Sequence, residues 1–129
     1  MKIIHGLKEN QVLQRKGKKG ARLILTGECS NQGPVSATLY LKQKALPRFK
    51  DISSGQVKQG RFRIQLKGIP AGGPYALHLS CGKETLQVKK FYCGDVWVLA
   101  GQSNMEGVGL MSGAARPHPS IQSFSMRRE

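Results

Sequence analysis

The sequence predicts a mainly β protein, with an antiparallel β-sandwich over residues 1–93 and the start of an α/β domain over residues 94–129. Three observations lead to this prediction. Most segments before residue 94 alternate between apolar and polar residues, which is typical of strands with one buried face. Turn signals rich in glycine, serine or proline separate them, as in sandwich folds. From Val96 to Ala100 the chain is apolar throughout, as in a strand covered on both faces.

The alternating segments follow one another at short intervals along the chain. The clearest is the segment 61–69, in which Phe62, Ile64 and Leu66 share one face and polar residues share the other. The expected strands are residues 12–15, 21–29, 35–42, 61–69, 75–81 and 85–93. The basic stretch 14–22 contains two glycines, so we expect it to turn between the first two strands.

The pattern changes at Gly94. The apolar run Val96–Ala100 predicts a buried first strand. Residues 115–120 are expected to form a proline-flanked linker, and residues 121–126 a second strand. This order is that of the opening of an α/β domain. Such a domain usually needs about 100 residues or more. We therefore expect this region to be only the truncated start of one.

Composition narrows the function classes. The chain has 129 residues, 39% of them hydrophobic, which is enough to form a core. No apolar run approaches the roughly 20 residues that span a bilayer, and the amino-terminal residues lack the apolar centre of a secretory signal. We expect no membrane partner.

The three cysteines, Cys29, Cys81 and Cys93, lack metal-ligand spacing, so we expect no metal site. Whether they are free thiols or form one disulfide remains open.

The net charge of +14, from 21 Lys+Arg against 7 Asp+Glu, raises the possibility of a polyanionic partner. Solvated strand faces and loops explain the same charge, because the basic residues are dispersed. Only 6% of the residues are aromatic, which argues against a nucleic-acid partner that is bound by stacking. A basic β module that binds glycan or polyanion without chemistry is thus the alternative to an enzyme.

The turn after the apolar run carries the candidate chemistry. Ser103 follows Val96–Ala100 at a strand-to-helix turn, where its hydroxyl would be exposed and helix N–H groups would face a developing oxyanion. Ser103 to Glu106 also fits the capping-box pattern S-x-x-E, in which the serine only caps a helix. Glycines at 107, 109 and 113 make that helix a poor one. They do not form a dinucleotide fingerprint, because Ser112 stands where the third glycine is needed. We expect no cofactor.

These residues resemble a known family. The stretch 94–107, GDVWVLAGQSNMEG, closely resembles the first catalytic block of sialate O-acetylesterases and related carbohydrate acetylesterases of the SGNH hydrolase type, whose catalytic domain is flavodoxin-like. VLQR at 12–15 and AGGPYALHL at 71–79 resemble two segments of the amino-terminal β domain of that family, in the same order. The resemblance spans nearly the whole chain and is most specific at GQSNM.

The resemblance implies that Ser103 is the nucleophile and that its backbone N–H forms part of the oxyanion hole. Gly101, Gln102 and Asn104 match the motif and would shape the turn. The substrate would be an O-acetylated carbohydrate. Relatives often act outside the cytoplasm or in lysosomes.

The sequence also departs from the family. Relatives carry the rest of the oxyanion hole and a late Asp-x-x-His pair downstream, and these blocks are not among the 129 residues. His118 has no aspartate three residues before it, so we do not expect it to be the base. His5 and His78 belong to the β domain, and Asp51 and Asp95 are expected in a loop and in a structural role. The 129-residue chain by itself is expected to be inactive, because loss of a triad member costs several powers of ten in rate.

Overall fold

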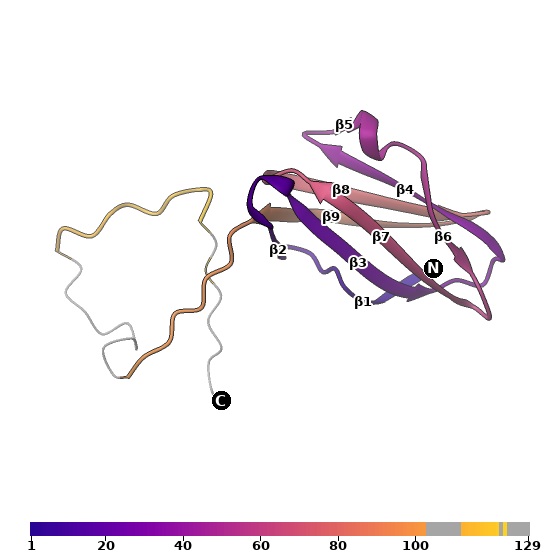
Figure 1. Ribbon diagram of the computed structural model, residues 1–129, viewed down its shortest axis with the longest axis horizontal. Coiled ribbons are helices and arrows are strands. Elements are labelled where there is room, and N and C mark those ends of the chain that lie inside the picture. The colour runs from indigo at the N-terminus through magenta and orange to yellow at the C-terminus, as the bar shows by residue number, and fades with distance from the viewer. Residues whose placement is uncertain (103–111, 122, 124–129) are drawn as a thin grey trace. The chain divides into compact units, whose positions relative to one another are not determined.

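The computed structural model describes residues 1–102, 112–121 and 123 of the chain (Figure 1). Residues 1–97 form one compact unit, and the chain from residue 98 forms another. The first unit contains nine strands and two short 3-10 helices. They are β1 (Lys2–His5), β2 (Val12–Gln14), η1 (Gly17–Lys19), β3 (Ala21–Glu28), β4 (Gly33–Leu41), β5 (Lys44–Ala45), η2 (Pro47–Phe49), β6 (Ile52–Val57), β7 (Arg61–Ile69), β8 (Gly72–Cys81) and β9 (Glu84–Gly94).

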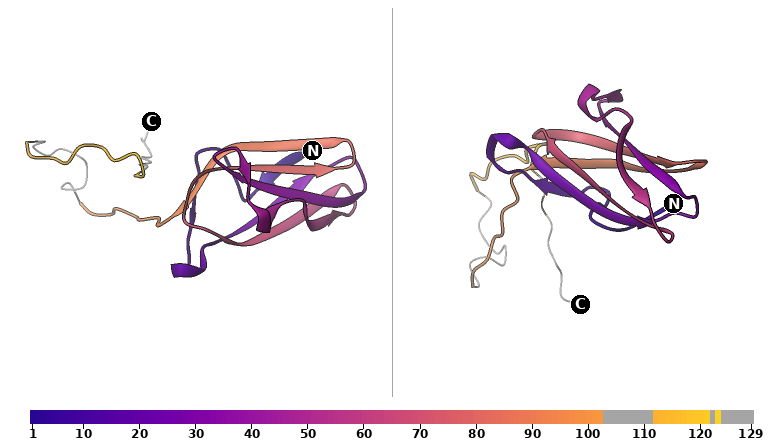
Figure 2. Two further views of the ribbon diagram at one scale, coloured as in Figure 1. Left: turned by 90° about the horizontal axis from the view of Figure 1, so that it is seen from above. Right: turned by 45° about the vertical axis from the view of Figure 1, so that its right-hand side comes forward.

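The strands form two sheets, which lie face to face in Figure 2. The smaller sheet has the order β1-β3-β7 and is antiparallel. The larger sheet has the order β2-β9-β8-β4-β5, and β6 also pairs with β4. This arrangement is the mainly β sandwich that the alternating pattern predicts, and each of the six expected strands is present.

One hydrophobic core fills the space between the sheets. On β7 the buried residues are Phe62, Ile64, Leu66 and Ile69, and the polar neighbours of the first three face outward. On β8 the buried residues are Tyr75, Leu77, Leu79 and Cys81. These side chains belong to a single cluster, so burial of the apolar half of each strand holds the sheets together.

Two details of the sandwich differ from the prediction. The predicted antiparallel sandwich contains one parallel pair, because β2 pairs in parallel with β9. Three strands were not predicted, and β6 is the most informative of them because its sequence, ISSGQV, resembles a turn. A Cβ atom on Gly55 of β6 would lie 2.5 Å from the Arg63 carbonyl oxygen. Glycine at this position therefore lets β6 pass close to β7.

The described residues of the second unit contain neither helix nor strand. Turns occur at residues 112–113 and 119–120, and the Ile121 N–H donates to the His118 carbonyl oxygen at 2.9 Å. The apolar side chains of Val98, Leu99 and Ile121 are exposed. Most of the second strand expected at 121–126 lies outside the described residues.

Candidate active site

The residues assigned to the nucleophile turn fall partly outside the described residues. Gly101 and Gln102 are described as exposed residues without regular structure. Ser103 and Asn104 lie outside the described residues, as does the whole of the alternative capping box at 103–106. Ser103 as nucleophile and oxyanion donor, and the roles of its neighbours in shaping the turn, therefore stay predictions.

The apolar run before this turn is not a strand in the structure. Residues 96–100 have no strand pairing, and Trp97, Val98 and Leu99 are each more than four-fifths exposed. A strand that is apolar on both faces needs cover on both sides. The described residues give this run neither a neighbouring strand nor a covering helix, so its burial stays a prediction.

The chain leading into this run is held by the segment VLQR. Val12, Leu13 and Gln14 of β2 pair in parallel with residues 92–94 of β9. Two backbone hydrogen bonds extend the pairing, because Tyr92 N–H donates to the Gln11 carbonyl at 2.9 Å and Arg15 N–H donates to the Gly94 carbonyl at 2.8 Å. The end of β9 therefore has a fixed direction up to the residue before the apolar run.

Side chains of the same segment bind the next two residues. The Arg15 guanidinium donates from Nε to Asp95 Oδ1 at 2.9 Å and from Nη2 to Oδ2 at 2.7 Å. This two-pronged geometry is the stronger form of an arginine–carboxylate pair. It lowers the pKa of Asp95 below its ordinary value. The Val96 N–H donates to Gln14 Oε1 at 2.7 Å. Asp95 thus has the structural role that its place in the sequence predicts.

The segment GGPY packs against the same end of β9. Gly72 pairs with Cys93, and both Gly72 and Gly73 have positive φ angles, 132° and 135°. A Cβ atom on Gly73 would lie 2.8 Å from a ring carbon of Tyr92, so the close approach requires glycine. The Tyr75 hydroxyl donates to the Pro70 carbonyl at 2.9 Å, and its ring lies 5.6 Å from that of Phe91.

VLQR, GGPY and the first residues of GDVWVLA therefore meet at one end of the larger sheet. VLQR lies on one side of the end of β9, and GGPY lies on the other. Sequence reasoning identified these segments but missed that Gln14 and Arg15 bind the start of GDVWVLA. Their distance of about 80 positions from Asp95 and Val96 leaves no local pattern that could have revealed this.

His78, His118 and Asp51 make contacts within their own parts of the chain. His78 is half-buried in the β unit, and its ring lies 4.4 Å from that of Tyr40 between centroids, tilted by 40°. His5 is exposed, and His118 Nδ1 accepts the Ser120 N–H at 3.2 Å. Asp51 holds the loop after η2 by accepting the Thr38 hydroxyl at 3.0 Å.

The cysteines and charges of the described residues form no metal-binding group. Among these residues, no set of three or more histidine, cysteine, aspartate or glutamate side chains is grouped to hold an ion. All three cysteines are buried free thiols, which resolves the alternatives that the sequence left open. Burial raises the pKa of the Cys29 and Cys93 thiols.

No protein-family model and no curated protein matches this chain. In the described residues, no helix is both long enough and apolar enough to cross a membrane.

Proposed function

We propose that this chain is the amino-terminal part of a serine-dependent carbohydrate O-acetylesterase of the sialate O-acetylesterase type. The observation that supports the proposal best is the meeting of VLQR, GGPY and GDVW at the end of β9. These are the segments that resemble the family. Their contacts fix the chain as far as Val96, five residues before the motif GQSNM begins.

In the proposed reaction, the Ser103 hydroxyl oxygen attacks the acetyl carbonyl carbon of an O-acetylated sugar. A base takes the hydroxyl proton and passes it to the departing sugar oxygen, which leaves an acetyl-serine. Water, activated by the same base, then attacks the acetyl-serine and releases acetate. Backbone N–H groups at the turn, that of Ser103 among them, stabilise the oxyanion.

The proposal requires a base from outside these 129 residues. The resemblance assigns this role to an Asp-x-x-His pair, which the sequence printed here does not contain. The His118 imidazole accepts a hydrogen bond from its own turn, so we give it no role in the reaction. We therefore propose that a longer form of the chain supplies the pair and completes an α/β catalytic domain.

Hydrolysis of an aryl acetate tests the proposal. The 129-residue chain should show negligible turnover. A longer form from the same gene should hydrolyse the ester and lose about three powers of ten or more in kcat with Ser103→Ala. Ser112→Ala is the matched control, because it removes a hydroxyl from an exposed turn of the same region and should leave the rate unchanged. A longer form without an Asp-x-x-His pair, or full activity of Ser103→Ala, would overturn the proposal.

A further inference from the structure

The outer faces of the two sheets differ in charge. On the smaller sheet, the outward residues of β3 and β7 include Arg22, Arg61, Arg63 and Lys67, which we call the basic face, and one carboxylate, Glu28, opposite Arg61. On the larger sheet, the outward residues of β4 and β8 are uncharged, with histidine taken as neutral, whereas β9 carries the exposed Lys89 and Lys90. Of the cations on these strands, four therefore lie on the smaller sheet and two on the larger.

The basic face contains an unfavourable contact that an anion would relieve. Arg22 and Lys67 are direct partners across β3 and β7, so their side chains lie next to each other on the same face. Like charges placed opposite each other in a sheet are destabilising. The two ion pairs found among the described residues involve Met1 and Arg15, so neither pairs a cation of this face.

The basic face presents hydrogen-bond donors in a row. Arg61, Arg63 and Lys67 span about 20 Å along β7, at roughly 3.4 Å per residue. Gln65 lies between them, and its Oε1 accepts from Arg22 Nη2 at 3.0 Å. Gln65 Nε2 is itself buried beneath the row and has no acceptor among the described residues. A surface hollow adjoins one end of the row, and its lining includes the cations Lys58, Arg61 and Arg63 and the carboxylate Glu28.

The shape and composition of the face select the class of anion. Its outward positions on β3 and β7 carry no aromatic side chain on which the bases of a single strand could stack. The pair β3–β7 is flanked by β1, and β6 packs beside β7. The face is therefore broader than the two-stranded ribbon that enters the major groove of DNA. A polymer with spaced carboxylate or sulfate groups fits a row of arginine side chains, because each guanidinium group can bind one anionic group through two hydrogen bonds.

We propose that the basic face binds a linear anionic polysaccharide that carries carboxylate or sulfate groups. The polysaccharide would lie along β7, with its anionic groups between Arg22, Arg63 and Lys67. This proposal stands independently of the esterase proposal, because it needs only residues of the β unit. A binding measurement tests it, whatever the outcome of the esterase assay.

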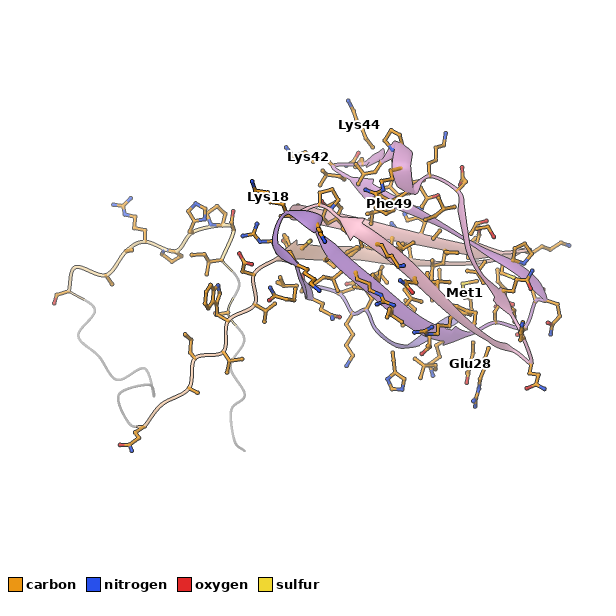
Figure 3. All side chains as sticks on the ribbon, viewed as in Figure 1. Met1, Lys18, Glu28, Lys42, Lys44 and Phe49 are labelled. Atoms are coloured by element: carbon orange, nitrogen blue, oxygen red, sulfur yellow. The ribbon has the colours of Figure 1, made fainter. Side chains whose placement is uncertain are left out.

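The test uses two variants of the 129-residue chain with the same net charge. The first, Arg61→Gln with Arg63→Gln and Lys67→Gln, neutralises the basic face. The second, Lys42→Gln with Lys44→Gln and Lys83→Gln, neutralises three exposed lysines of other hairpins. Figure 3 shows Lys42 and Lys44 at the β4–β5 hairpin, well separated from Glu28 of β3. A difference between the variants therefore reports the location of the charge.

Binding is measured to heparin, polygalacturonate and neutral dextran at about 50 and about 200 mM salt. We expect the unchanged chain to bind both anionic polymers and not dextran. The basic-face variant should bind at least about tenfold more weakly, with a slope of log K against log salt that is shallower by about two to three. The control variant should keep its affinity within about threefold. Preference for heparin or for polygalacturonate identifies sulfate or carboxylate as the recognised group.

Three results of the binding measurements would overturn the proposal. They are equal weakening by both variants, equal binding of dextran, and tighter binding of duplex DNA or of phosphatidylserine vesicles than of either polysaccharide. Lys67→Gln alone separates loss of binding from loss of folding, because it removes the repulsion between Arg22 and Lys67. We expect it to weaken binding while the urea midpoint of unfolding stays the same or rises. A fall in the midpoint that accounts for the lost binding would also contradict the proposal.

Discussion

Two regions of this chain handle apolar residues in opposite ways. In residues 1–97, the apolar members of each alternating segment are buried between two sheets, as with Leu77, whose side chain is fully buried. In the described residues from 98 onward, the apolar side chains are exposed, and Leu99 is 81% exposed. A strand with one polar face must be packed on its other face only, and in the β unit the opposite sheet packs against it. A run without a polar face must be packed on both faces, and the described residues pack on neither.

The sharpest test of this comparison is the same substitution in both regions. Leu77→Ala should lower the free energy of unfolding by about 2–5 kcal/mol, because it leaves a cavity in the core. Leu99→Ala should change it by less than about 0.5 kcal/mol, because the leucine side chain is already in water. Urea unfolding of the 129-residue chain measures both. Equal effects would mean that Leu99 is buried in solution and that the comparison fails.

The buried thiols of the β unit give a second test. Cys29, Cys81 and Cys93 are each at most 4% exposed, and burial raises the pKa of Cys29 and Cys93. A thiol-reactive disulfide reagent should therefore modify the native chain at least about 100-fold more slowly than the chain in urea. Rapid modification of all three thiols in the native chain would show that the two sheets separate readily.

An acid titration tests how the loop after β3 is fixed. Glu84 Oε1 accepts the N–H groups of Ser30 and Asn31, each at 2.9 Å, and the carboxylate also binds the amino-terminal ammonium group of Met1. The ammonium contact, followed by the Asn31 N–H and the Cys29 thiol, lowers the pKa of Glu84 from 4.5 to about 2.

A carboxyl group whose pKa is lower in the folded chain stabilises the fold fully when the pH is above its pKa in the unfolded chain. This contribution is lost as the pH falls toward its pKa in the folded chain. The unfolding midpoint of the unchanged chain should therefore exceed that of Glu84→Gln above about pH 4.5. The gap should close between that pH and about pH 2. A gap that is constant with pH would show that the carboxylate charge contributes nothing to folding.

Much of the β unit could be predicted from the sequence, because alternation records which face of a strand is buried. Each expected strand, such as residues 61–69, lies within about three residues of its predicted bounds. Where alternation is weak, prediction failed. The residues of β6 include Ser53, Ser54 and Gly55, which are typical of a turn, and their pairing depends on contacts with β4 and β7.

The candidate site could be predicted only as separate segments. The sequence places VLQR, GGPY and GDVW in the chain, but the parallel pairing of β2 with β9 is a long-range contact. Nothing in residues 12–14 indicates a partner about 80 positions away. The direction of β2 follows from the whole sandwich, so the Arg15–Asp95 contact is visible only once the fold is known.

The smallest expected effect concerns this contact, at the point where the β unit leads into the apolar run. Arg15→Ala removes both hydrogen bonds to Asp95, and the single tryptophan of the chain, Trp97, follows two residues later. The anisotropy of Trp97 fluorescence should fall, while the urea midpoint stays nearly unchanged, because exposed ion pairs contribute little to stability. Arg22→Ala is the matched control and should leave the anisotropy as it is. An unchanged anisotropy in Arg15→Ala would mean that the pairing of β2 with β9 and the Gln14–Val96 bond suffice to direct the chain.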